Sequence, residues 1–227
     1  MKKKLIVAID GPAGAGKSTV ARIVARELGY LYIDTGAMFR ALTWKALHHN
    51  TNLRSARGLV RLAETTDIRL KHDRAHDTLR VFVDGKDRSR QIRTEKVSLH
   101  TNEIAKVKGI RRILREQQRR IGKNGGVVME GRDIGTRVFP RAAAKFYLDA
   151  SPSERARRRY SELKSGGKKV NLERIAHALA QRDYKDKNRG ISPLRQAHDA
   201  RVIDSTHLSL EQVAQKILAW VRRTPIL

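Results

Sequence analysis

Gly11-Pro12-Ala13-Gly14-Ala15-Gly16-Lys17-Ser18 is the stretch that decides the fold of this chain. It matches the phosphate-binding pattern G-x-x-x-x-G-K-[ST] at every fixed position. An apolar run over 5–9 precedes it, and a helical pattern over 19–28 follows. A glycine-rich turn between a buried strand and a helix aims several backbone N–H groups at one point, where the helix dipole adds positive potential. The stretch therefore predicts a site for the phosphates of a nucleoside triphosphate.

Two side chains of this loop have predicted roles of their own. Lys17 is expected to reach the β- and γ-phosphates, and the Ser18 hydroxyl is expected to ligate Mg²⁺. The residues expected to bind the triphosphate are Gly11, Pro12, Ala13, Gly14, Ala15, Gly16, Lys17, Ser18 and Thr19. The loop identifies the phosphoryl donor but leaves the acceptor open.

Composition limits the class of protein. A length of 227 residues with 40% hydrophobic residues suits one α/β domain with insertions, or a core with a small lobe. The sequence has no cysteine, which excludes a disulfide framework and a thiolate metal site. Lys2-Lys3-Lys4 precedes an apolar run too short for a signal peptide, and no stretch is long enough to span a membrane. We therefore expect a cytoplasmic protein without a membrane partner.

The charge of the chain is unusually positive. The 49 Lys and Arg residues oppose 23 Asp and Glu residues, which gives a formal net charge of +26. Nucleic-acid binding is one interpretation, and a compositional bias spread over solvated faces is the other. The second is favoured because the cations are dispersed and only 5% of residues are aromatic. We expect non-specific binding to polyanions at low salt and no specific nucleic-acid partner.

Strand and helix patterns alternate along most of the chain. Core strands are predicted at 5–10, 30–33, 127–130, 146–149 and 202–204. Helices are predicted at 19–28, 36–49, 55–65, 94–121 with a break at Gly109, 153–163, 171–186 and after the capping box of Ser209 and Gln212. Short apolar strands separated by helices indicate a parallel sheet covered on both sides. The loop then lies at the carboxyl end of the first strand, where such sheets bind ligands.

An antiparallel insert interrupts this alternation. Short strands are predicted at 68–70 and 79–83, and Asp84-Gly85 is a strong turn signal. The predicted fold is therefore an α/β P-loop core, with a five-stranded parallel sheet flanked by helices and a small antiparallel insert.

Three further polar stretches are found. Those at 34–40 and 130–136 come after predicted strands, and the third lies at 181–189. Each taken alone is compatible with a solvated polar turn. For the stretch at 181–189, the sequence favours neither this interpretation nor a functional one. Together they bring several arginines and aspartates towards one phosphate site. Phosphoryl transfer to a charged acceptor requires such a set, because its catalysis is mostly positioning and charge neutralisation.

With these motifs, the chain resembles the bacterial cytidylate kinases of the long-insert type, over nearly its whole length. The matching segments are Ile9-Asp10-Gly11-Pro12 with the loop, Asp34-Thr35-Gly36-Ala37-Met38, Ile92-Arg93-Thr94, Gly131-Arg132-Asp133-Ile134-Gly135-Thr136, Arg182-Asp183, Ile191-Ser192-Pro193-Leu194 and Asp204-Ser205-Thr206. The resemblance implies transfer of the γ-phosphoryl group of ATP to CMP or dCMP with Mg²⁺, in pyrimidine metabolism. It also implies a core at 1–34 and 122–227 with a lid at about 155–190, and a monophosphate-binding region at 35–121 that includes the β insert 67–93.

The resemblance also implies roles for individual residues. Arg40 and Arg132 hold the acceptor phosphate, Arg182 and Asp186 address the ribose, and Asp133, Arg111 and Arg189 address the cytosine. The implied CMP-binding residues are Thr35, Arg40, Asn102, Arg111, Arg132, Asp133, Arg182, Asp186 and Arg189. The implied catalytic residues are Lys17, Arg132, Arg182 and Arg158, with Arg155 and Arg159 as alternatives to Arg158 for contact with the transferring phosphoryl group.

Three positions depart from the family pattern. Glu130 stands where many relatives carry Asp, and Phe39 stands where many carry Tyr. Asn102 falls where relatives have a Ser that helps to bind the cytosine amine. An amide can accept a hydrogen bond from cytosine or donate one to uracil, so the expected rejection of UMP is weaker.

Two other functions remain open from the sequence. One is a small P-loop kinase for UMP, another monophosphate or a small metabolite. The other is a nucleic-acid-binding P-loop ATPase, which the charge of +26 suggests. The short chain and the absence of a helicase-like second motif argue against the ATPase. We expect a monomer.

Overall fold

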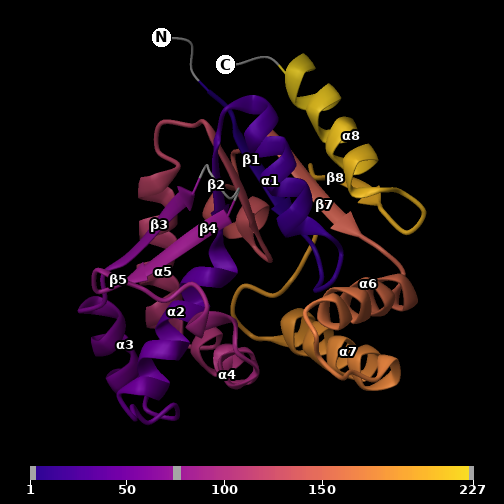
Figure 1. Cartoon of the computed structure of the whole chain (residues 1–227). Coiled ribbons are helices and arrows are strands. Elements are labelled where there is room, and N and C mark those ends of the chain that lie inside the picture. The colour runs from indigo at the N-terminus through magenta and orange to yellow at the C-terminus, as the bar shows by residue number, and fades with distance from the viewer. Residues whose placement is uncertain (1–3, 74–77, 225–227) are drawn as a thin grey trace. The chain divides into compact units, whose positions relative to one another are not determined.

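The computed structural model describes residues 4–73 and 78–224, and the chain divides into two units (Figure 1). The first unit comprises Met1–Tyr30 and Gly125–Leu227, and the second comprises Leu31–Asn124. No helix within the described residues is long and apolar enough to cross a membrane.

The predicted five-stranded sheet is confirmed. Its strands are β1 (Ile6–Asp10), β2 (Leu31–Asp34), β6 (Val127–Gly131), β7 (Ala144–Asp149) and β8 (Arg201–Asp204), in the order β2-β6-β1-β7-β8. Strand β1 runs parallel to β6 and β7, and its Ile9 is in register with Glu130 and Phe146. Val7, Ala8 and Ile9 of β1 are almost fully buried, as the central place of this strand in a parallel sheet requires, and Ile6 is half-buried. The carboxyl end of β1 leads directly into the phosphate-binding loop.

The helices of the first unit begin and end largely where the sequence predicts. They are α1 (Lys17–Leu28), α6 (Pro152–Ser165), α7 (Leu172–Asn188) and α8 (Leu210–Arg223). Gly29 ends α1 in the left-handed region with φ of 63°, and Asn171 caps α7. The capping box of Ser209 and Gln212 starts α8. Helix α8 packs on α1, and α6 packs beside α7 (Figure 1).

The second unit contains the predicted antiparallel insert. Its strands are β3 (Ile68–Asp73), β4 (Thr78–Val83) and β5 (Lys86–Asp87), and its helices are α2 (Thr35–His48), α3 (Ala56–Glu64), α4 (Glu95–Ala105) and α5 (Lys108–Ile121). Asp84 and Gly85 form the two-residue turn between β4 and β5, both with positive φ. The sequence did not predict β5, because Lys86 and Asp87 are poor strand formers.

The predicted helix break at Gly109 was wrong. The chain leaves α4 after Ala105 and starts α5 at Lys108, so Gly109 lies in the first turn of a helix. Its role is close packing: a Cβ atom at Gly109 would lie 2.5 Å from Cγ2 of Val60 on α3. The glycine therefore permits the approach of two helices instead of ending one.

Candidate active site

The phosphate-binding loop depends on glycine for both its conformation and its packing. Gly14 and Gly16 have φ of 78° and 85°, in the left-handed region. A Cβ atom at Gly14 would lie 3.1 Å from Cβ of Arg155, and one at Gly16 would lie 2.6 Å from Cδ2 of Leu210. Gly16 precedes α1 without a side-chain cap, which leaves the first N–H groups of that helix available to an anion.

Lys17 is a buried cation in a positive environment. Its side chain is almost wholly enclosed, and its Nζ donates a hydrogen bond to the Pro12 carbonyl at 2.5 Å. Burial, followed by the positive charges of Arg132 and Arg182, lowers the pKa of Lys17 to about 7, although the Glu130 carboxylate opposes this shift. A bound polyphosphate would favour the charged form of Lys17.

Arg132 and Arg189, two predicted site residues of the first unit, both lie at the carboxylate of a third, Asp186. The Arg132 Nε donates to the Asp186 Oδ2 at 2.9 Å, and the Arg189 Nη1 lies 3.5 Å from the Asp186 Oδ1. Burial favours the protonated form of Asp186, but the guanidinium groups of Arg132, Arg182 and Arg189 hold its pKa below the usual range. The structure therefore brings Arg132, Asp186 and Arg189 together, with the charge of Arg182 close enough to act on both Asp186 and Lys17.

Asp10 is a buried carboxylate that we did not select from the sequence. Its two oxygens accept hydrogen bonds from the backbone N–H groups of Ile134 and Gly135, at 2.9 and 2.7 Å. These belong to a π-helical turn (Ile134–Val138) that directly follows Arg132 and Asp133. Asp10 thereby joins the end of β1 to the segment that carries two predicted site residues. The available signal was an acidic residue that ends an otherwise apolar, buried strand.

A second buried pair holds the loop from the side of α6 and α7. Asp183 on α7 accepts from the backbone N–H of Ala13 at 3.3 Å and forms an ion pair with Arg155 on α6. The Arg155 Nη1 also donates to the Ala13 carbonyl at 3.1 Å. The resemblance had offered Arg155 as a contact of the transferring phosphoryl group; in the structure its guanidinium binds the loop backbone and Asp183.

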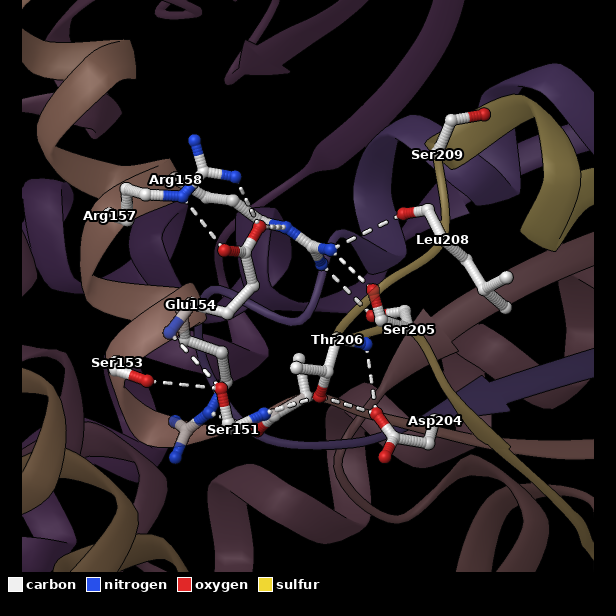
Figure 2. A network of polar contacts seen from close by, with 12 residues as sticks. Ser151, Ser153, Glu154, Arg157, Arg158, Asp204, Ser205, Thr206, Leu208 and Ser209 are labelled. Carbon is white, nitrogen blue, oxygen red and sulfur yellow. Dashed lines mark hydrogen bonds and ion pairs between the residues drawn. The ribbon is translucent and has the colours of Figure 1, made fainter.

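Arg158 lies beside the loop but is engaged elsewhere (Figure 2). Its Nη1 would be 3.7 Å from a Cβ atom at Gly16. Its Nε donates to the Glu154 Oε1 at 2.8 Å, and its Nη1 donates to the Ser205 Oγ at 2.9 Å. A contact between Arg158 and the transferring phosphoryl group stays a prediction. Arg159, the other alternative, pairs with Glu162 on the same helix.

The segment Asp204-Ser205-Thr206 ties the start of α6 to the sheet (Figure 2). Asp204 accepts from the backbone N–H and the hydroxyl of Thr206, at 2.8 and 2.5 Å. The Thr206 hydroxyl in turn accepts from the backbone N–H of Ser151, which caps α6. The Ser205 hydroxyl donates to the Asp149 carbonyl at the end of β7.

The remaining predicted residues lie in the second unit. The Asp34 carboxylate caps α2 by accepting from Ala37 at 2.9 Å, and it pairs with the Arg40 Nη2 at 2.6 Å. Burial alone would raise the pKa of Asp34, but the Arg40 charge and then that of Arg93 lower it overall. Thr35, the first residue of α2, is buried.

Asn102 lies on α4, and Arg111 lies on α5, the next helix along the chain. The Arg111 Nε donates to the Ala105 carbonyl at 2.5 Å, and the guanidinium lies 5.1 Å from the centre of the Phe39 ring. The amide oxygen and nitrogen of Asn102 are both buried and, within the described residues, have no hydrogen-bond partner. Buried amides are normally hydrogen-bonded, so Asn102 is unusual among the polar groups of α4.

The loop carries one candidate side chain for a metal ion, the Ser18 hydroxyl. Ser18 is exposed in the first turn of α1, directly after Lys17. In the part of the chain that the structure describes, no group of three or more His, Cys, Asp and Glu side chains is arranged to hold a metal ion. A hydroxyl beside a phosphate site fits Mg²⁺, which is usually bound through few protein ligands together with substrate phosphates and water.

Comparison with known proteins identifies the family. The family model of cytidylate kinase matches residues 7–223. The cytidylate kinase of Bacillus subtilis (strain 168) is 48% identical over 223 residues, which cover 98% of this chain and 99% of that protein. The cytidylate kinase of Pelotomaculum thermopropionicum is 49% identical over 215 residues, 95% of each chain. A bifunctional pantoate ligase/cytidylate kinase of Synechococcus sp. (strain JA-3-3Ab) is 46% identical over 97% of this chain and 41% of that protein.

Similarity to solved structures is weaker. A shikimate kinase from Bacteroides thetaiotaomicron has a TM-score of 0.48 and 14% identity, over 96% of this chain and 98% of that one. Similarity at this level does not bear on the assignment. The whole-length sequence matches do, and the chain belongs to the cytidylate kinase family.

Proposed function

We propose that this protein transfers the γ-phosphoryl group of ATP to CMP or dCMP, giving ADP and CDP or dCDP. The family assignment supports this reaction. The observation that carries it is the environment of Lys17, a buried lysine of a phosphate-binding loop whose pKa is lowered by burial and then by the charges of Arg132 and Arg182. Arg132 and Arg182 place positive charge beside Lys17. Such a set is suited to a highly charged ligand, because bound phosphates would favour the charged form of Lys17.

The donor half of the proposed site is the loop. Backbone N–H groups between Gly11 and Thr19 would hold the ATP phosphates, with Lys17 at the β- and γ-phosphates. Ser18 is the side chain expected to hold Mg²⁺, which would neutralise charge on the phosphate oxygens. The chain's own part in the transfer is to fix these groups beforehand, so that little reorganisation accompanies the reaction.

The acceptor half of the proposed site follows the assignments made from the sequence. We assign the monophosphate-binding region to 35–121 and the lid to about 155–190. Arg40 and Arg132 would hold the CMP phosphate, and Arg182 and Asp186 would address the ribose. Because the acceptor phosphate is largely ionised near neutral pH, the attack needs no general base.

The base-binding part of the proposal rests on hydrogen-bond complementarity. Asp133 would accept from the exocyclic amine of cytosine, and Arg111 and Arg189 would donate to its ring acceptors. Uracil presents an acceptor where cytosine has its amine, so it would meet the Asp133 carboxylate unfavourably. The unpartnered amide of Asn102 supports a place for this residue beside the base.

A coupled assay of ADP release tests the function. CMP and dCMP are expected to support turnover, with UMP poorer and AMP and shikimate inactive. Absence of turnover with CMP and dCMP at millimolar concentration would overturn the proposal. ATP hydrolysis that depends on DNA or RNA, without monophosphate turnover, would favour a nucleic-acid-binding ATPase instead.

The formal charge of +26 supports one further expectation about partners. Retention on a heparin or RNA matrix at low salt is expected to disappear as salt is raised, because screening weakens contacts between exposed charges. Retention that persists at high salt would indicate a specific polyanion partner. A monomer acting in the cytoplasm also stays a prediction, which gel filtration and cell fractionation would check.

A further inference from the structure

The ion pair of Arg155 and Asp183 is buried and has no role in the proposed chemistry. Arg155 is 8% exposed and Asp183 is 7% exposed. The pair connects α6 to α7. Removing two charges from water is costly, so a buried ion pair is weak evidence of a contribution to stability. Its placement against the phosphate-binding loop indicates another use.

This pair binds both the backbone N–H and the backbone carbonyl of one loop residue, Ala13. The Ala13 N–H donates to the Asp183 Oδ1 at 3.3 Å, and the Ala13 carbonyl accepts from the Arg155 Nη1 at 3.1 Å. The Arg155 Nε donates in addition to the Ala150 carbonyl at 3.0 Å, at the end of β7. Arg155 therefore binds three acceptors through two separate nitrogens, Nε and Nη1, which the planar guanidinium holds in a fixed arrangement.

The next loop residue shows how close this contact is. Gly14 has a positive φ, and a Cβ atom there would lie 3.1 Å from both Cβ and the carbonyl oxygen of Arg155. The loop therefore lies directly against the backbone of α6 at this point. Asp183 is also the immediate neighbour of Arg182 on α7, so the same contact sets that helix against the loop.

We propose that Arg155 and Asp183 are positioning residues that hold the phosphate-binding loop in the shape that binds ATP. This inference rests on the proposed function of the loop. A loop whose N–H groups converge on one point brings like dipoles together, and its left-handed residues are conformationally restricted. Bonds to both sides of Ala13 fix the loop before ATP arrives, which lowers the ordering cost of binding.

A merely structural pair would behave differently from a positioning pair. Loss of a structural pair lowers the unfolding temperature and weakens both substrates alike through the unfolded fraction. Loss of a positioning pair weakens ATP selectively. The CMP-binding carboxylate Asp186 keeps its own bonds to Arg132 and Arg189, so CMP affinity is expected to be retained.

The test uses the full chain and measures ATP and CMP binding separately by titration calorimetry, with the unfolding temperature as a third readout. Asp183→Asn keeps the size of the side chain, and Arg155→Met keeps much of its length. Each is expected to weaken ATP binding at least about tenfold, as the loss of hydrogen bonds to charged groups predicts. CMP affinity is expected to change less than about threefold, within ordinary context effects.

Two further variants sharpen the test. Arg155→Lys keeps the charge but has one nitrogen in place of Nε and Nη1, so it is not expected to restore ATP affinity. The double variant Arg155→Met/Asp183→Asn is expected to lose no more than about threefold beyond the weaker-binding single variant, because the two residues act as one unit. Arg157→Met on α6 and Glu173→Gln on α7 are matched controls, exposed and expected to bind ATP as the unaltered chain does.

Either of two results would overturn the inference: unchanged ATP affinity in Asp183→Asn, or equal losses for ATP and CMP. Full rescue by Arg155→Lys would also contradict it, since charge alone would then suffice. If Arg155→Met does not fold, the isosteric Asp183→Asn still decides the question. CMP turnover by the unaltered chain tests the proposed function separately, because ATP binding is measured without CMP.

Discussion

The Oδ2 of Asp10 lies 2.7 Å from the backbone nitrogen of Gly135, although the two residues are 125 positions apart in the sequence. Through this bond and its companion to Ile134, the end of β1 is joined to the segment after Arg132 and Asp133. The strand that leads into the donor loop therefore also positions residues proposed to bind the acceptor. One buried carboxylate thus connects the loop to the segment that carries Arg132 and Asp133.

Asp10→Asn should change how stability depends on pH. Burial raises the pKa of Asp10 from 3.8 to about 6, so the folded chain binds this proton more tightly than the unfolded chain. The contribution of Asp10 to stability is therefore greatest at acid pH and is lost as pH rises from about 4 to about 6, by roughly 3 kcal/mol. An asparagine side chain does not titrate, so the free energy of unfolding of the Asp10→Asn variant lacks this dependence on pH. Urea unfolding of both proteins below and above this window measures the difference, and a difference independent of pH would contradict the assignment.

Lys17→Ala should abolish turnover and leave the fold intact. The side chain is buried and its pKa is lowered to about 7, so its removal relieves a desolvated charge. We expect kcat/KM to fall by about a thousandfold, because a cation aimed at the transferring phosphate is lost. Steady-state kinetics and the unfolding temperature measure the two effects. A normal rate would mean that the loop is not the phosphate site, and an unfolded variant would contradict the expected stability.

Asp133→Asn should reduce the discrimination between CMP and UMP. An amide can donate to the uracil carbonyl, whereas the carboxylate can only accept. Loss of the charged hydrogen bond should lower kcat/KM for CMP by about tenfold or more, with UMP unchanged or improved. Parallel assays with both nucleotides check the ratio. An unchanged ratio in Asp133→Asn would remove this residue from base recognition.

Asn102→Ala should weaken CMP without weakening the fold. Both amide atoms of Asn102 are buried without a partner among the described residues, which costs about 1–3 kcal/mol per unsatisfied group. Removing them should leave the unfolding temperature of the ligand-free protein equal or higher. The KM for CMP should rise by about tenfold, because CMP would lose a hydrogen-bond partner.

Ser98→Ala is the matched control for this prediction, since Ser98 is exposed on the same helix and its hydroxyl donates to the Thr94 carbonyl one turn earlier. A lower unfolding temperature together with an unchanged KM in Asn102→Ala would show that Asn102 serves the fold and not the ligand.

The sequence predicted well those elements that are determined by residues close together in the chain. The loop, the caps at Gly29, Asn171 and Ser209, and the Asp84-Gly85 turn depend on residues within a few positions of one another. The short apolar strands follow from burial on both faces of a parallel sheet. The place of the break between α4 and α5 did not follow, because Gly109 is required by packing against Val60.

The sequence by itself determined that this chain has a phosphate-binding loop on a parallel sheet, because those features follow from spacing and periodicity. Only the tertiary structure decided what holds the loop in place. Ala13 and Asp183 are 170 positions apart, and Asp10 and Ile134 are 124 apart. Such pairings depend on how strands and helices come together, so no local pattern contains them.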